Sequence, residues 1–318
     1  MSNQAPHRPT QTIAILQYNL NKSQPTTHSI LNSSTSNKYA VLMLQEQYFS
    51  SFTNSSLTHH SWVLIESRRR ESNPPRAAIY VNKSVLPAHS YEPIPLKVPD
   101  AVAITIRLDQ EHHPTLLVNI YNTKNTSQLS ELRAELQIHL QNNIYNGIII
   151  AGDFNLHHPL WNPPTYHTHD SEADTLIDTM SWLGLRPMLP AGTVTFPRAN
   201  TAIDLVWGDD YVEQRMIKCR VPKACDHGSD HYPIETILNL QPCPYGPEAQ
   251  RPYNYNKTDW KVFEEKLTRY LPVLDPFATP TAKTIDKLAE DISTAIRRAT
   301  METTPRANVC PFSKRWWN

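Results

Sequence analysis

The stretch that decides the interpretation of this sequence is Gly152-Asp153-Phe154-Asn155-Leu156-His157-His158-Pro159-Leu160-Trp161. It directly follows Gly147-Ile148-Ile149-Ile150-Ala151, a short apolar and β-branched run that predicts a fully buried strand. Asp153 and Asn155 therefore lie just past a strand end, where a rigid sheet aims polar side chains and a loop leaves them accessible. Gly-Asp-x-Asn is also good turn chemistry, so the stretch alone leaves a functional site and a simple turn equally open.

The same arrangement recurs along the chain in a fixed order. Ile13 to Leu16 leads into Gln17-Tyr18-Asn19, and Val41 to Leu44 leads into Gln45-Glu46. Two further polar motifs follow, Ile203-Asp204-Leu205 and Gly228-Ser229-Asp230-His231-Tyr232-Pro233-Ile234. Several apolar runs thus deliver carboxylate, amide or imidazole groups, which favours the functional site over the turn.

In this order the motifs resemble the endonuclease/exonuclease/phosphatase superfamily, over roughly residues 10 to 240. The Gly-Ser-Asp-His-x-Pro-Ile motif is the most specific part of the resemblance. The Asp-Phe-Asn motif with His157 to Trp161 is similar to the nicking endonuclease domain of non-LTR (LINE-like) retrotransposons. The ending Ser313-Lys314-Arg315-Trp316-Trp317-Asn318 is similar to the segment that precedes the reverse transcriptase in those elements.

The strand and helix pattern predicts an α/β (α+β) fold, a four-layered sandwich of two packed, mainly antiparallel β-sheets flanked by helices. Too many strands follow one another for a βαβ chain. The strand candidates besides those above are 62–65, 77–81, 102–108, 116–120, 193–196, 202–207 and 233–238. A short helix is expected near 29–31, and a longer one with Ser127 as N-cap and one apolar face made of Leu129, Leu132, Leu136 and Leu140. Another helix is expected from Ser171 to Leu183, where Ser171 to Asp174 form a capping box and Gly184 ends the helix.

The predicted organisation is a disordered N-terminus over 1–10, the main domain over 11–240, a linker over 241–257 and a small helical extension over 258–318. The extension carries one amphipathic helix with Trp260, Phe263, Leu267 and Leu271, and another with Ile285, Leu288, Ile292 and Ile296. Two short helices cannot bury a core alone.

Composition limits the possible environments. The formal net charge is zero with a pI near 7.2, so any affinity for nucleic acid has to come from local basic groups. The four cysteines have no zinc-type spacing and are expected to be reduced thiols. Met1 to Gln11 contain no apolar h-region, and no stretch of about 18 apolar residues occurs, so we expect a protein that is neither secreted nor membrane-spanning. We expect an intracellular protein, and the resemblance implies a nuclear one when it acts.

The resemblance implies a role for each motif residue. Glu46, with Asn19 beside it, and Asp230 would hold Mg²⁺, with Mn²⁺ as an alternative, since all are hard oxygen donors. Asp153 would activate the attacking water from an exposed strand end, and Asn155 would hold the phosphate. His231, oriented by Asp204, would contact a phosphate oxygen, and Tyr121 would hydrogen-bond the phosphate.

The implied function is a metal-dependent endonuclease that nicks double-stranded DNA and leaves 3′-hydroxyl ends to prime reverse transcription. A reverse transcriptase domain in a full-length element is the implied partner. Two alternatives remain open: a phosphomonoesterase of the same superfamily, because loops choose the substrate, and a catalytically unused, retrotransposon-derived fragment that binds nucleic acid. The cluster of Arg68, Arg69 and Arg70 with Arg76 suits either a DNA backbone contact or a solvated loop.

Overall fold

The computed structural model describes residues 12–68, 73–107, 113–124, 127–239, 254–272 and 281–305. The chain divides into two compact units, Met1–Gly246 and Pro247–Asn318, and each is described by itself. The predicted N-terminal segment and most of the predicted linker lie outside the described residues, so the domain boundaries stay predictions.

The first unit contains two six-stranded sheets. The first sheet has the order β13-β14-β1-β2-β6-β5 and the second the order β11-β12-β10-β9-β8-β7. The strands of the first are β1 Ile13–Asn19, β2 Val41–Gln45, β5 Trp62–Glu66, β6 Ala77–Asn82, β13 Met216–Arg220 and β14 Ile234–Leu238. Those of the second are β7 Tyr91–Ile94, β8 Ala101–Ile106, β9 Thr115–Tyr121, β10 Gly147–Asp153, β11 Arg186–Pro187 and β12 Asp204–Gly208. A separate hairpin pairs β3 Phe49–Ser50 with β4 Ser55–Ser56.

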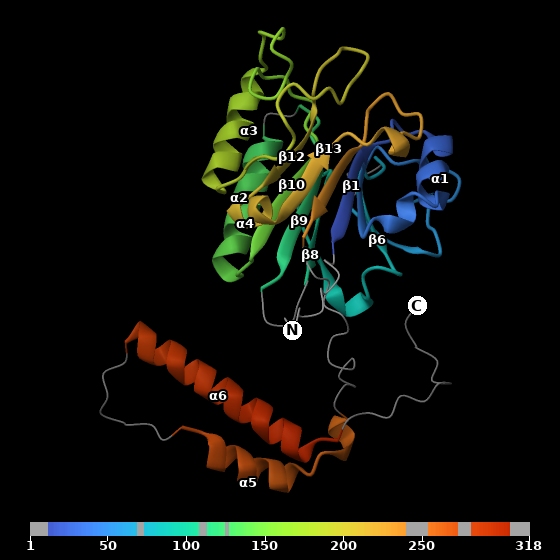
Figure 1. The fold of residues 1–318 in the computed structure, drawn as a ribbon. Helices are drawn as coiled ribbons and strands as arrows, with labels where there is room; N and C mark the ends of the chain where they lie inside the picture. The colour runs from blue at the N-terminus through green and yellow to red at the C-terminus, as the bar shows by residue number, and fades with distance from the viewer. Residues whose placement is uncertain are drawn as a thin grey trace, which may run out of the picture. The chain divides into compact units, whose positions relative to one another are not determined.

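Helices cover the outer faces of the two sheets, as Figure 1 shows. The helices of this unit are α1 Gln24–Asn32, α2 Gln128–Asn142, α3 Ser171–Trp182 and the short α4 Asp210–Arg215. The leucines of α2 and the apolar face of α3 pack on the outer face of the second sheet. Ile30 and Leu31 of α1 pack on the outer face of the first. The predicted four-layered sandwich is confirmed.

Each sheet has one parallel pair of strands at its centre among otherwise antiparallel neighbours. These pairs are β1 with β2 and β9 with β10. Because paired parallel strands run the same way, their carboxyl ends lie at one edge of each sheet. This strand order therefore brings the predicted polar residues at the strand ends close together.

The layer between the two sheets is apolar at one end and polar at the other. Side chains alternate along a strand, so every second residue faces the opposite sheet. The inward rows are Ile13-Ile15-Gln17-Asn19 in β1, Val41-Met43-Gln45 in β2, Leu117-Asn119-Tyr121 in β9 and Ile149-Ala151-Asp153 in β10. The apolar part forms a core buried from both sides, and the polar part forms the base of a candidate site.

Gly152 is required by the close approach of β10 to β9. A Cβ atom at this position would lie 1.9 Å from the carbonyl oxygen of Ile120, its neighbour in the parallel ladder. We expect Gly152→Ala to lower the free energy of unfolding by about 3 kcal/mol, because backbone atoms cannot move aside like a flexible side chain.

Chemical denaturation checks this expectation, with Gly184→Ala as the matched control. A Cβ at Gly184 would meet nothing within 4 Å, so that variant should lose only the left-handed backbone preference, about 1 kcal/mol. Equal losses in the two variants would contradict the steric argument.

The structure corrects two local predictions. The segment 193–196 is not a strand: only an isolated bridge joins Phe196 to Thr201, so the segment is part of a loop. The capping box at Ser171 is wrong as well, because Asp170 is the N-cap and Ser171 is the first helical residue. The carboxylate of Asp170 accepts hydrogen bonds from the backbone and ring of His157, which fixes the entry to α3 one residue earlier.

The predicted end of α3 at Gly184 is confirmed. Gly184 has φ +70°, and its N–H donates to the carbonyl of Ser181 while Leu185 N–H donates to that of Met180. This pair of bonds is the Schellman arrangement, which glycine favours because it lacks a Cβ.

The second unit is a helical hairpin of α5 Trp260–Tyr270 and α6 Ala282–Thr303. Lys266 and Tyr270 both bind the carboxylate of Glu302, which joins the two helices. Among the unit's described residues, the buried apolar side chains are Ala295 and Ala299. Much of the predicted apolar faces stays exposed, as expected for a helix pair with little core.

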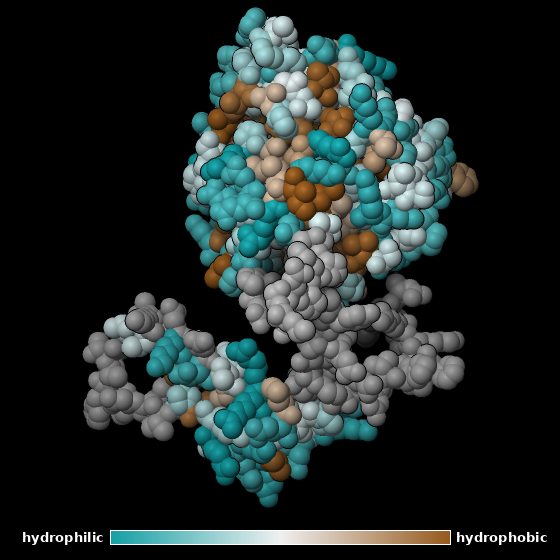
Figure 2. Space-filling model, viewed as in Figure 1, coloured by the Kyte–Doolittle hydropathy of each residue, from teal (hydrophilic) through white to brown (hydrophobic). Residues whose placement is uncertain are grey.

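The face of the first unit seen in Figure 2 is mostly hydrophilic, with apolar residues in small separate groups. Within the described part of the chain, none of the helices has the length and apolar character that crossing a membrane requires.

Candidate active site

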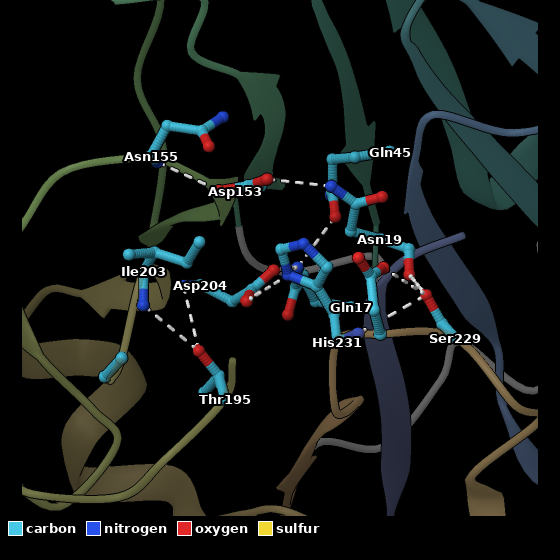
Figure 3. Close-up of polar contacts among 12 residues, drawn as sticks. Gln17, Asn19, Gln45, Asp153, Asn155, Thr195, Ile203, Asp204, Ser229 and His231 are labelled. Carbon is cyan, nitrogen blue, oxygen red and sulfur yellow. Dashed lines mark hydrogen bonds and ion pairs between the residues drawn. The ribbon is translucent and has the colours of Figure 1, made fainter. Parts of the chain in front are cut away.

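Two rows of polar side chains face each other at the shared edge of the sheets (Figure 3). In the second sheet, Tyr121, Asp153 and Asp204 lie side by side, because Asp153 pairs with Tyr121 on one strand and with Asp204 on the other. In the first sheet, Asn19 of β1 lies beside Gln45 of β2. Residues that are far apart in the sequence thus meet in one place.

Asp153 is held from two directions. Its Oδ2 accepts a hydrogen bond of 2.7 Å from Asn19 Nδ2, across the sheets, and its Oδ1 accepts one of 2.9 Å from the backbone N–H of Asn155. The side chain is 1% exposed, so the expectation of an exposed carboxylate is wrong. Asp153 is the last inward-facing residue of β10. Strand β1 of the facing sheet contacts it through Asn19 and shields it from solvent.

His231 and Asp204 form a buried pair. The ring Nδ1 lies 2.8 Å from Asp204 Oδ2, and Phe196 packs on the ring. The hydroxyl of Thr195 accepts from the backbone N–H groups of Ile203 and Asp204, which fixes the start of β12. Burial alone would lower the pKa of His231, but the Asp204 carboxylate outweighs it and raises that pKa to about 9. The ring is therefore an imidazolium at neutral pH.

Asp153, Asp204 and His231 are close enough to act as one cluster. One ligand atom from each lies within 4.8 Å of the other two. Burial and the like charge of Asp204 raise the pKa of Asp153 far above its ordinary value, against the opposing effect of His231. This is the kind of electrostatic environment that gives a carboxylate the strength of a base near neutral pH.

Glu46 and Asn155 each follow a central strand and share an unusual backbone conformation. Their φ angles are +46° and +53°, in the left-handed region that non-glycine residues rarely occupy. Residues held in this conformation are concentrated at functional sites. The Asn155 side chain donates to the carbonyl of Asn122 at 2.9 Å.

Tyr121 lies near two carboxylates, Glu46 and Asp153. Burial, then the charges of Glu46 and Asp153, raise the pKa of its hydroxyl, so the phenol stays protonated and can donate a hydrogen bond. Glu46 itself is paired with Lys22, whose Nζ lies 3.0 Å from Oε1.

Asp230 directly precedes His231 in the Gly-Ser-Asp-His loop. Its carboxylate contributes to the electrostatic environment of His231 and pairs with Arg198 Nη1 at 3.4 Å. The neighbouring Ser229 hydroxyl donates to the backbone carbonyl of Asn19 at 2.7 Å, which ties the Gly-Ser-Asp-His loop to β1. The predicted residues therefore lie at or next to the strand ends that form the site, and Glu46 and Asp230 are outside the compact cluster of Asp153, Asp204 and His231.

A buried network of side-chain amides lies beneath the site, and the sequence-based prediction did not include it. Gln17 Nε2 donates to Gln45 Oε1 at 2.7 Å and to Asp204 Oδ1 at 3.0 Å. Asn119 binds the Gln45 amide and the backbone carbonyls of Leu44 and Ala78 in the facing sheet. The signal that could have revealed this network is the lone amide inside each apolar run, because a buried amide needs hydrogen-bonding partners.

The sequence-based prediction also did not include Asn122, which lies in the loop directly after β9. Its side chain donates to the carbonyl of Phe154 at 2.8 Å while its own carbonyl accepts from Asn155. It therefore clamps the Asp-Phe-Asn turn from both sides.

Residues 115–235 match the model of a family described as endonuclease-reverse transcriptase. The search of curated proteins found no match. Among solved structures, the endonuclease domain of TRAS1, a telomere-specific non-LTR retrotransposon, superposes with a TM-score of 0.57 at 19% identity, over 73% of this chain and all of that domain. The resemblance to the endonuclease/exonuclease/phosphatase superfamily is confirmed.

Two further solved structures share the fold of this chain. The catalytic domain of Xenopus laevis APE2 superposes with a TM-score of 0.58 at 16% identity, over 74% of this chain and 94% of that one. The AP endonuclease LMAP from Leishmania major gives 0.56 at 14% identity, over 73% and 89%. At these identities the likeness is one of fold.

The candidate site in this chain fits a hard divalent cation. Its donors are carboxylates, amide oxygens and one imidazole, while the described cysteines, Cys219 and Cys225, are buried elsewhere as free thiols. Once Asp153 is ionised, two buried carboxylates share a single imidazolium, which leaves negative charge for a cation to neutralise. Lys22 and Arg198, the cations paired with Glu46 and Asp230, are mostly exposed and are free to move aside.

The stability of the metal-free protein should fall as the pH rises from about 6.5 to 9. The folded state raises the pKa of both His231 and Asp153 above their unfolded values, so each contributes stability while protonated. The contribution of His231 to the free energy of unfolding is lost as the pH rises from its unfolded pKa of about 6.5 through about 9. The contribution of Asp153 is lost over a range that begins at lower pH.

Thermal melts in EDTA measure this effect. Asp153→Asn and His231→Gln should each flatten the dependence, and Mg²⁺ should restore stability mainly at the higher pH, where the carboxylates are ionised. A melting temperature that rises over this range would contradict the assignment.

Proposed function

We propose that this protein is a metal-dependent endonuclease that hydrolyses DNA phosphodiester bonds to nick its target. The observation that carries the proposal is the buried cluster of Asp153, Asp204 and His231 at the edge where the central strands of both sheets end. The match of residues 115–235 to an endonuclease-reverse transcriptase family supports the same substrate class.

Asp153 is proposed to orient the attacking water and take its proton. Its two hydrogen bonds, from Asn19 and from the backbone of Asn155, fix the direction of the carboxylate. The raised pKa makes it a better proton acceptor than an ordinary aspartate, provided that it is ionised at the working pH.

His231 and Tyr121 are proposed to bind the phosphate. The imidazolium, fixed by Asp204, places a positive N–H near a non-bridging oxygen, where negative charge grows as the water attacks. The neutral Tyr121 hydroxyl and the Asn155 amide are further donors to the phosphoryl oxygens.

A divalent cation such as Mg²⁺, when bound, would neutralise charge on the phosphate and on the leaving 3′ oxygen. Glu46, Asn19 and Asp230 are the residues proposed to hold it, with the carboxylates of the cluster close by. Mn²⁺ has the same ligand preference and is expected to substitute.

The finer parts of the proposal concern the biological context. The nick would leave a 3′-hydroxyl that primes reverse transcription by a linked reverse transcriptase, with the chromosomal DNA in the nucleus as the target. The TRAS1 domain supports this context, since it belongs to a telomere-specific non-LTR retrotransposon.

A comparison of substrates tests the reaction class. Purified protein is incubated with supercoiled plasmid and, separately, with a phosphomonoester and a nucleotide, and the nicked plasmid is offered to a DNA polymerase. We expect nicked circles that the polymerase extends without other treatment, because a 3′-hydroxyl is present. Turnover of the phosphomonoester with intact plasmid would replace this proposal by the phosphatase alternative.

A further inference from the structure

Arg76 and Asp100 form a bridge between the two sheets next to the candidate site. Arg76 directly precedes β6 of the first sheet, and Asp100 directly precedes β8 of the second. Asp100 Oδ2 accepts from Arg76 Nη2 at 2.7 Å, and Oδ1 accepts from the backbone N–H of Arg76 at 3.2 Å. Both oxygens of one buried carboxylate thus hold a single arginine.

The backbone of this pair anchors two site residues. The carbonyl of Arg76 accepts from the N–H of Glu46 at 2.9 Å, and the carbonyl of Asp100 accepts from the N–H of Tyr121 at 2.8 Å. Asp100 has φ +56°, a conformation that costs free energy in a non-glycine residue and that the surrounding contacts maintain. Arg76 is therefore fixed relative to Glu46 and Tyr121.

The guanidinium stands over the ring of Tyr121, with Cζ 4.8 Å from the ring centroid. Its side chain is 29% exposed, whereas Lys22 and Arg198 nearby are 66% and 72% exposed. In the described part of the chain, Asp100 is its one hydrogen-bonding side-chain partner. A guanidinium has five N–H donors in a planar fork suited to phosphate, so donors remain for a ligand.

We propose that Arg76, aimed by Asp100 and Tyr121, is a binding residue that contacts a backbone phosphate of the DNA substrate at the mouth of the site. The inference rests on the proposed function, because it needs DNA as the ligand. It separates Arg76 from Arg68 and the residues after it, with which it forms one cluster in the sequence. A role confined to joining the sheets would need no free donor and no accessible charge.

The salt dependence of DNA affinity distinguishes the two roles, and it requires no catalysis. Each phosphate contact adds about 0.9 to the slope of log affinity against log salt for duplex DNA. Binding of a duplex oligonucleotide is measured in EDTA between about 50 and 200 mM salt for wild type and Arg76→Met, which keeps the side-chain stem and removes the charge. We expect a slope shallower by about 1 and a loss of affinity of about five- to tenfold, which corresponds to the loss of one phosphate contact.

The matched control is Arg186→Met. Arg186 is also paired with acids, Asp210 and Glu213, but at the end of the second sheet opposite the site. It should keep the wild-type slope. If Arg76→Met does not fold, Arg76→Lys keeps the charge and loses the fork, so it should keep the slope and bind at least about threefold more weakly.

The outcomes separate this inference from the proposed function. Wild-type protein that neither binds nor nicks DNA overturns both. Wild-type protein that binds and nicks, beside an Arg76→Met variant with an unchanged slope, overturns the inference alone. An Arg186→Met variant that loses as much slope as Arg76→Met also overturns it, since the effect would then not belong to the site.

Discussion

An Asp153→Asn variant is expected to nick plasmid DNA about 10²- to 10⁴-fold more slowly than wild type, the usual contribution of a positioned general base. Asparagine keeps the shape of the side chain and can accept one of its two hydrogen bonds, but it cannot take a proton from water. Initial rates of plasmid relaxation at saturating Mg²⁺ measure the loss.

The fold should survive this substitution, which makes the loss interpretable. In wild-type protein Asp153 and Asp204 repel each other in a buried place, so a neutral residue at 153 removes an unfavourable charge. The variant should melt at or above the wild-type temperature in EDTA at pH 8. A folded Asp153→Asn protein with wild-type turnover would remove Asp153 from the mechanism.

Replacing His231 by glutamine is expected to lower nicking by about 10²- to 10³-fold, as for the loss of one donor to a developing oxyanion. Glutamine can still donate a hydrogen bond, but it carries no positive charge. The matched control is His169→Gln, because His169 is a half-exposed loop histidine paired with Asp174 and away from the cluster.

The pH profile tests the same residue in a second way. Activity that depends on the imidazolium should fall at alkaline pH, as His231 loses its proton near its pKa of about 9. An Asp204→Asn variant lacks the negative charge that contributes most to raising the pKa of His231. The alkaline limb of its pH–activity profile should therefore lie at lower pH. An unchanged limb in a folded Asp204→Asn variant would contradict the pairing.

The sequence predicted the fold because its signals are local and repeated. Short β-branched apolar runs such as Ile148 to Ala151 predict central strands, and the polar residue that follows each run marks its carboxyl end. Since Asn19, Glu46, Tyr121 and Asp153 all follow such runs, one topological fact was enough to bring them together.

What the sequence could not predict depends on contacts between distant residues. The burial of Asp153 comes from Asn19 on the facing sheet, which no window around Asp153 contains. Arg76 lies next to a cluster of arginines in the sequence, while its partner Asp100 comes from a different sheet. The segment 193–196 has strand-like composition, but its hydroxyl at Thr195 serves the backbone of β12 instead.

The measurement that tests the central claim most directly is relaxation of supercoiled plasmid by the wild-type protein in Mg²⁺ and in EDTA, beside Asp153→Asn in Mg²⁺. The account predicts nicked circles only for wild type with the metal. Intact plasmid in every reaction, with protein shown to be folded by its thermal melt, would contradict the endonuclease assignment, and nicking that persists in EDTA would contradict its dependence on a metal.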